Sequence, residues 1–262
     1  MATTTMQIER REPALGATVT GVDLGSLDDA TFDALHQAFL EHHVLCFREQ
    51  DITPEQQLEF AARWGRISYH PYVPSLEGHA GIMEIYQVTG ITETWHADTT
   101  HVVAPPKITM LLARELPEIG GDTMFANMHR AYDELSDGLR RCIDDLRAVH
   151  YGTELAAEQG VAKEAVTHSH PVAIKHPETG RRTLFVNANY VRHFDGWTPE
   201  ESAPLLAYLE SRAERYENQY RHVWQPGDLV MWDNRSVQHR VVADYSGRRY
   251  LHRVTLEGDP FE

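Results

Sequence analysis

The sequence predicts a mainly β fold with peripheral helices, built as a β-sandwich or an open barrel. Three observations lead to this prediction. Helical patterns are few and begin in the first third of the chain, strand-like runs fill most of the remainder, and one long insert interrupts these runs. This order of elements is typical of a sheet-based core that is covered by helices.

Four stretches carry helical signals. Two of them open with a capping box, in which a threonine precedes a proline and is followed three places later by glutamine or glutamate. The first stretch instead places its apolar side chains on one stripe of a helix. The expected helices cover residues 28–41, 53–64, 128–146 with a break near 136–138, and 198–217.

Runs of apolar and β-branched residues between these helices indicate strands. A turn at residues 176–180 joins two of the runs into a β-hairpin. The chain has no internal repeat and no glycine- or serine-rich linker, so we expect a single domain over residues 1–262. The expected strands cover residues 43–48, 81–88, 107–115, 123–126, 171–175, 183–186, 229–232, 238–242 and 249–256.

Composition excludes several classes of function. The 262 residues carry a formal net charge of -15, which disfavours binding to nucleic acid or to an anionic membrane. No apolar run approaches the roughly 18 residues that cross a membrane, and the first residues contain no apolar signal-peptide core. The two cysteines, Cys46 and Cys142, lie in apolar-periodic segments. We therefore expect a protein of the reducing cytoplasm.

Two separated fragments, residues 95–98 (Trp-His-Ala-Asp) and 232–239, supply a candidate metal site. In an extended segment the two-residue spacing puts His96 and Asp98 on one face, where both reach the same ion. His239 follows an apolar strand and a turn and is expected near a barrel rim. Two histidines and one carboxylate are the ligands of the non-haem Fe(II) facial triad. Zinc also accepts these donors, but a structural zinc site has four protein ligands, usually with cysteine.

A pair of arginines follows His239 by about ten residues. In the strand expected at 249–256, Arg249 and Arg253 share one face. An arginine that faces a barrel interior must meet an anion, because an unpaired buried charge is costly. Its guanidinium group binds a carboxylate or sulfonate through two parallel hydrogen bonds. The alternative interpretation is an exposed strand face that pairs with the acidic residues of the chain.

These residues resemble the taurine/2,4-dichlorophenoxyacetate dioxygenase family (TauD/TfdA) of Fe(II)- and 2-oxoglutarate-dependent oxygenases. The resemblance covers most of the chain and depends on the order of its motifs. The matching segments are the opening strand at 15–24, the strand at 44–48, Trp-His-Ala-Asp at 95–98, Gly-Gly-Asp-Thr at 120–123, the turn at 176–180, Trp-Asp-Asn-Arg-Ser-Val-Gln-His at 232–239, and the arginines at 249 and 253.

The resemblance implies a double-stranded β-helix (jelly-roll) core and a catalytic Fe(II) ion held by His96, Asp98 and His239. It also implies that 2-oxoglutarate chelates this iron while its distal carboxylate pairs with Arg249 and accepts a hydrogen bond from Thr123. O2 is the second cosubstrate of such enzymes.

The resemblance also places His70 and Arg253 where relatives hold the anionic head group of their substrate, with Tyr72 and Thr92 beside them. Relatives that use taurine carry an aromatic residue at the position of Val73 and asparagine at the position of Thr92. The sequence therefore argues against taurine and for another small anionic substrate.

The activity implied is hydroxylation of a sulfonate, alkyl sulfate or aryloxyalkanoate, which leads to C–S or C–O cleavage. Hydroxylation or desaturation of an amino-acid-like or natural-product substrate is the alternative within this enzyme class. A zinc-dependent hydrolase and a non-catalytic binding jelly roll are the alternatives outside it. The expected partner is a small molecule, and the oligomeric state stays open.

Overall fold

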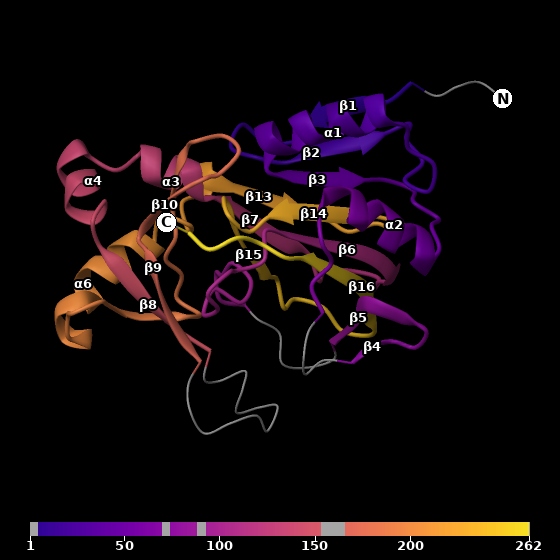
Figure 1. The fold of residues 1–262 in the computed structure, drawn as a ribbon. Helices are drawn as coiled ribbons and strands as arrows, with labels where there is room; N and C mark the ends of the chain where they lie inside the picture. The colour runs from indigo at the N-terminus through magenta and orange to yellow at the C-terminus, as the bar shows by residue number, and fades with distance from the viewer. Residues whose placement is uncertain (1–4, 70–73, 88–92, 153–165, 262) are drawn as a thin grey trace.

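Two facing sheets form the centre of the protein (Figure 1). This computed structural model describes residues 5–69, 74–87, 93–152 and 166–261. Neighbouring strands of the larger sheet are antiparallel except β2 and β3, which run parallel. In spatial order, the larger sheet contains β1 (Gln7–Arg10), β2 (Ala17–Thr20), β3 (Val44–Phe47), β14 (Leu229–Asp233), β6 (Ile108–Glu115), β16 (Arg249–Leu256), β5 (His79–Gln87) and β4 (Ser75–Leu76).

The smaller sheet consists of β13 (Gln219–His222), β7 (Thr123–Asn127) and β15 (Val237–Val241). An apolar interior joins the two sheets: Leu111, Trp232 and Leu251 of the larger sheet belong to the same buried cluster as Phe125 and Val237 of the smaller one. Successive residues of a strand point to opposite faces, so every second side chain of β6, β14 and β16 enters the space between the sheets.

The other face of the larger sheet is covered by two helices, α1 (Asp29–His42) and α2 (Pro54–Trp64) (Figure 1). Phe39 and Phe60 of these helices share a buried cluster with Met110, Leu112 and Val254 of the strands. The capping box that the sequence predicts at the start of α2 is present. These helices make the larger sheet a rigid support for the side chains on its inner face.

The segment between β7 and β13 forms a second apolar cluster beside the two sheets. Its helices and strands flank one side of the molecule (Figure 1). It contains α3 (Met128–Asp133), α4 (Asp137–Ile143), β8 (Arg147–Tyr151), β9 (Thr167–Pro171), the hairpin β10 (Ala173–Lys175) and β11 (Arg182–Leu184), β12 (Val191–Phe194), α6 (Pro199–Glu210) and a 3-10 turn at Tyr216–Asn218.

The predicted mainly β fold with peripheral helices is confirmed. The hairpin at 171–186 and the break between α3 and α4 are also present. The sequence missed β8, β9 and β12, which pair with one another across long stretches of chain. Residues from Arg147 onward pair as β8, so the helix expected to reach residue 146 ends at Ile143.

The last helix is also shorter than the sequence predicts. It was expected to reach residue 217, but α6 ends at Glu210. The side-chain amides of Asn218 and Gln219 donate hydrogen bonds to the carbonyl groups of Arg212 and Ala213, at 3.2 and 2.9 Å. These bonds take up carbonyls that a longer helix would have used, and they turn the chain into β13, a strand that the sequence also missed.

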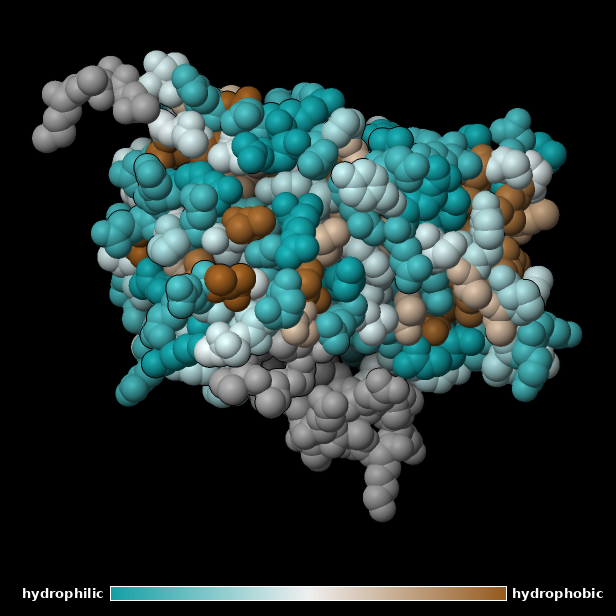
Figure 2. All heavy atoms as spheres, turned by 180° about the vertical axis from the view of Figure 1, so that it is seen from behind, coloured by the Kyte–Doolittle hydropathy of each residue, from teal (hydrophilic) through white to brown (hydrophobic). Residues whose placement is uncertain are grey.

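The surface is largely hydrophilic. Hydrophilic residues cover most of the face seen from behind, and hydrophobic residues form only small groups on it (Figure 2). Among the described residues, no helix has the length and apolar character that crossing a membrane requires.

A buried polar network fixes the turn that leads from β14 to β15. Arg235 holds the Asp233 carboxylate through two hydrogen bonds of 2.8 and 2.7 Å, and His176 contacts the same carboxylate at 2.9 Å. Two further rings continue this group. The ring centroid of His129 lies 5.6 Å from that of His176, and the ring centroid of His43 lies 5.1 Å from that of His129. The network holds the residues that immediately precede His239.

These histidines predict a stability that depends on pH. Burial lowers the pKa of His43 to about 3 and that of His129 to about 4, whereas an unfolded chain binds these protons below about pH 6.5. Above pH 6.5 these histidines are neutral in both states, and the free energy of unfolding does not depend on them. As the pH falls below 6.5, the free energy of unfolding decreases by about 1.4 kcal/mol per pH unit for each such histidine, until the pH reaches the pKa of the folded state.

Urea denaturation of the metal-free protein between pH 7.5 and pH 5 measures this decrease. The variant His129→Asn is the comparison, because an asparagine amide can still donate to the carbonyl group of Arg182 that the His129 ring contacts at 2.8 Å. We expect its free energy of unfolding to change less steeply with pH, because the variant takes up one proton fewer when it unfolds. Equal slopes for the two proteins would show that His129 takes up its proton in the folded state.

Candidate active site

The structure brings His96, Asp98 and His239 together between the two sheets. The main chains of His96 and His239 exchange two hydrogen bonds, of 3.1 and 2.7 Å. They form one isolated antiparallel bridge beside β15, at the edge of the smaller sheet. The Nε2 atoms of His96 and His239 lie 3.9 and 3.8 Å from Oδ1 of Asp98. All three residues are buried.

Both imidazole rings are prepared to bind a cation. Nδ1 of His96 lies 2.9 Å from the carbonyl oxygen of Thr94, which can only accept. Nδ1 therefore carries the proton, and the lone pair of Nε2 faces the site. Burial lowers the pKa of His96, and it lowers the pKa of His239 to about 3, so both rings are neutral near pH 7. The His239 ring also packs against Trp232, with centroids 4.6 Å apart.

The carboxyl group of Asp98 is ionised. Burial by itself would raise its pKa, but the positive charge of Arg253, 2.8 Å away, and the nearby histidines outweigh burial and hold the pKa well below its ordinary value. The hydroxyl group of Thr109 adds a hydrogen bond of 2.6 Å to Oδ2. Oδ1 is thus the oxygen that faces the two imidazoles.

The three donor atoms fit one divalent ion. Two atoms that each lie about 2.1 Å from an ion are at most about 4.2 Å apart, and the two measured separations fall below this limit. Two neutral imidazoles and one carboxylate bind iron through three positions and leave the rest of its coordination shell open. Within the described part of the chain, one further group, Cys46 with His222 and Asp228, has donor atoms equally close together.

The second group is a hydrogen-bonded cluster of the core. The Asp228 carboxylate accepts hydrogen bonds from Arg48 at 2.5 Å and from His222 at 3.1 Å. A guanidinium ion thus already occupies this carboxylate. Burial and the neighbouring Asp228 raise the pKa of the Cys46 thiol well above its ordinary value, so the thiolate that binds metals does not form at neutral pH.

A buried cradle is built around Arg249. Its side chain is almost fully buried, and its Nε donates to the carbonyl oxygen of Gly121 at 3.1 Å. The guanidinium group lies over the indole ring of Trp224, 5.6 Å from the ring centroid. Its Nη2 is 3.5 Å from Oγ1 of Thr123, which also accepts a hydrogen bond from Trp224. The structure therefore places Arg249 and Thr123 side by side, as the sequence predicts.

Arg253 lies on the same face of β16 as Arg249, four residues farther along the strand, and its guanidinium group contacts the Asp98 carboxylate. Its side chain keeps 23% of its surface exposed. The other residues expected at the substrate site, His70, Tyr72 and Thr92, lie outside the described residues, as does Val73.

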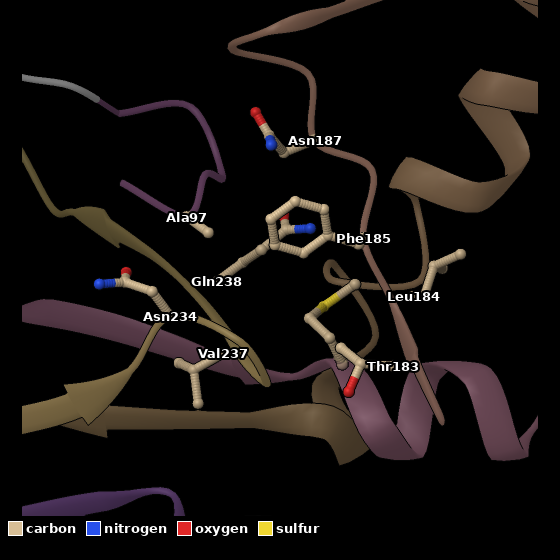
Figure 3. Close-up of a pocket in the computed structure, with 9 residues that line it drawn as sticks. Ala97, Thr183, Leu184, Phe185, Asn187, Asn234, Val237 and Gln238 are labelled. Carbon is tan, nitrogen blue, oxygen red and sulfur yellow. The ribbon is translucent and has the colours of Figure 1, made fainter. Parts of the chain in front are cut away.

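A small cavity of about 10 Å³, roughly the space of one water molecule, lies next to the candidate metal site (Figure 3). Its wall includes Ala97 and Gln238, the sequence neighbours of the candidate ligands. Figure 3 shows Ala97, Asn234 and Val237 on one side of this space and Leu184 on the other. Since neighbouring residues of an extended chain point to opposite sides, the cavity lies behind the ligands. It is also smaller than ordinary ligand pockets.

Sequence reasoning missed three residues of the site. Asn234 was visible only as one letter of the 232–239 motif, and it accepts a hydrogen bond from the main-chain nitrogen of Asp98. Thr109 is the one polar residue of the run 108–113, which is a weak signal. Trp224, beneath Arg249, lies outside every motif and has no signal in the sequence.

Comparisons with known proteins identify the family of this chain. Residues 7–255 match the family model described as "Taurine catabolism dioxygenase TauD, TfdA family". An alkylsulfatase of Acinetobacter baylyi is 36% identical over 97% of this chain and 86% of its own length. An alpha-ketoglutarate-dependent sulfate ester dioxygenase of Pseudomonas putida is 35% identical over 94% of this chain and 87% of its own length.

A solved structure, that of AAD-2 in complex with Mn(II) and N-oxalylglycine, has a TM-score of 0.86 and 29% identity. The match covers 98% of this chain and all of the other. The family and the enzyme class that the sequence predicted are thereby confirmed. The chain belongs to the TauD/TfdA family of dioxygenases.

Proposed function

We propose that the protein is an Fe(II)- and 2-oxoglutarate-dependent dioxygenase that hydroxylates a small anionic substrate, with alkyl sulfates as the first candidates. The observation that carries this proposal is the cluster of His96, Asp98 and His239, together with the arginine–threonine cradle that joins the two sheets. Relatives named for alkyl sulfate and sulfate ester chemistry support the substrate class.

Each residue of the cluster has a defined task in this proposal. Nε2 of His96, Nε2 of His239 and Oδ1 of Asp98 would hold Fe(II), which supplies the power to oxidise a C–H bond when 2-oxoglutarate and O2 are bound. The backbone bridge between His96 and His239 keeps the two imidazoles at a fixed separation. Trp232 restricts rotation of the His239 ring.

Arg249 and Thr123 would bind the distal carboxylate of 2-oxoglutarate. A planar guanidinium group donates two parallel hydrogen bonds to a carboxylate, and the Thr123 hydroxyl lies at its edge. Along β16, four residues separate Arg249 from Arg253, or about 13 Å between Cα atoms. Arg253 contacts the ligand Asp98, so this stretch of strand spans the distance from the cradle to the metal position.

Arg253, with His70, Tyr72 and Thr92, would bind the anionic head group of the primary substrate. The exposed part of the Arg253 side chain supports this role, because its guanidinium group contacts Asp98 while part of the side chain stays accessible to a ligand. In this arrangement the sulfate group is held by charge, and the adjacent carbon is directed toward the metal position.

The same proposal covers the broader architecture. The two facing sheets would be the double-stranded β-helix core, within one catalytic domain over residues 1–262. We also infer a cytoplasmic location, which the two free cysteines, Cys46 and Cys142, support.

Substrate identity can be tested by measuring succinate release over a panel of alkyl sulfates, sulfonates, aryloxyalkanoates and amino acids. Hydroxylation of the carbon that bears the sulfate oxygen gives a product that breaks into an aldehyde and sulfate. We therefore expect succinate, aldehyde and sulfate in equal amounts from the best alkyl sulfate. The uncharged methyl ether of the same alcohol is the matched control and should react at least about 30-fold more slowly, since a lost charged contact is worth about 2–5 kcal/mol.

Equal rates with the methyl ether would show that the pocket does not select an anion. Succinate release that is best supported by an amino acid would instead favour the alternative substrate class.

A further inference from the structure

We propose that Thr109, held in place by Asn234, is a positioning residue that restricts Asp98 to a single metal-binding oxygen. This inference rests on the proposed function, because it concerns the same metal site. It adds a reason why the site keeps enough open positions for its cosubstrates.

The two oxygens of Asp98 have different surroundings. Oδ2 accepts the hydroxyl proton of Thr109 at 2.6 Å and a hydrogen bond from Arg253 at 2.8 Å. Oδ1 faces the two imidazole Nε2 atoms, at 3.9 and 3.8 Å. Turning Oδ2 toward a metal ion would break two strong hydrogen bonds inside a buried site, and leaving their donors unpaired there is costly.

Asn234 fixes the direction of the Thr109 hydroxyl group. Its Nδ2 donates to Oγ1 of Thr109 at 3.0 Å, so the single hydroxyl proton of Thr109 is available to Asp98. The amide orientation follows from its other contacts, since Oδ1 of Asn234 faces two donors that can only donate: the main-chain nitrogen of Asp98 at 3.2 Å and the indole nitrogen of Trp232 at 3.0 Å.

The network therefore restrains Asp98 twice, through its main-chain nitrogen and through its carboxylate. All four members are buried: Thr109 is 0% exposed, Trp232 1%, Asn234 3% and Asp98 4%. Water does not replace these bonds readily at such depth. The network joins β6 to the end of β14, two neighbouring strands of the larger sheet, so its geometry is set by the sheet itself.

One-oxygen binding has a chemical consequence. Two imidazoles and one carboxylate oxygen would hold Fe(II) through three donors and leave open positions for the cosubstrates. A carboxylate that bound through both oxygens would take up one of these open positions.

The test uses Thr109→Val, which keeps the shape of the side chain and removes the hydroxyl group. Co(II) serves as the probe, because its binding and coordination can be followed by visible absorption without turnover. We expect the dissociation constant for Co(II) to rise about 10–100-fold, as is typical when an outer partner of a metal ligand is lost. We also expect the absorption band of the Co(II) protein to change, since the freed oxygen enters the coordination shell.

Two further variants separate positioning from general destabilisation. Thr109→Ser keeps the hydroxyl group and should restore both the affinity and the spectrum. Thr18→Val is the matched control, because Thr18 is a buried threonine of the same sheet whose hydroxyl has no hydrogen bond in the described chain. Its Co(II) affinity should equal that of the unchanged protein.

The outcomes distinguish this inference from the proposed function. If Asp98→Asn binds Co(II) as the unchanged protein does, the metal site itself is wrong. If Asp98→Asn loses Co(II) while Thr109→Val keeps the normal affinity and spectrum, only the positioning role is overturned. Should Thr109→Val fail to fold, Asn234→Ala provides the test: a weaker affinity with an altered spectrum supports the role, and unchanged values overturn it.

Discussion

Turnover is expected to fall by more than about 100-fold when His239 is replaced with alanine. Removing an outer partner of a metal ligand already costs 10–100-fold, and His239 supplies one of the three donor atoms themselves. The fold should survive, because β15 keeps its pairing with β7. Succinate release measures the loss of turnover. Anaerobic Fe(II) titration in the presence of 2-oxoglutarate, followed by visible absorption, measures the loss of metal binding.

His193→Ala is the control for this variant. His193 lies in β12 and bonds to Tyr151, away from the cluster, so both the absorption band and the turnover should remain. Full activity of the unchanged protein with zinc and without 2-oxoglutarate would contradict the iron assignment and favour a hydrolase.

The second large effect is expected at Arg249. Replacing it with alanine should raise the apparent KM for 2-oxoglutarate by roughly 30-fold or more, because the loss of a buried charged contact costs about 2–5 kcal/mol. Arg249→Lys should recover only part of the loss, since an ammonium group lacks the planar pair of donors. Steady-state kinetics with varied 2-oxoglutarate give the KM values directly.

The neighbouring residue provides a matched control. Arg248 is exposed and pairs with Glu115 at 3.0 Å, so Arg248→Ala should leave the KM unchanged. A normal KM in Arg249→Ala would show that a different arginine, such as Arg253, binds the distal carboxylate.

Half of the candidate metal-binding motif could be predicted from the sequence because it is local. His96 and Asp98 are two residues apart, and a spacing of two is enough to predict a shared face in extended chain. The two capping boxes are similarly local, and both are present in the structure. Arg249 and Thr123 needed the family resemblance, because 126 residues separate them.

The residues that the sequence did not reveal depend on long-range pairing. Asn234 meets Thr109 and Asp98 because β14 lies beside β6 in the larger sheet, and no local pattern encodes that order. The contact between Arg253 and Asp98 has the same origin. Likewise, β8 and β12 pair with distant partners, while each is short and mixes strand-forming residues with arginine and histidine.

The bridge between His96 and His239 also has a consequence for folding. The two residues are separated by more than half of the chain, yet their main chains pair directly. Such non-local contacts form late, because a long loop must close before they contribute. A partly folded or truncated chain therefore lacks the complete set of candidate donors. Under the proposed function, iron would be captured only after the two sheets have assembled, and bound iron would then stabilise the finished protein by mass action.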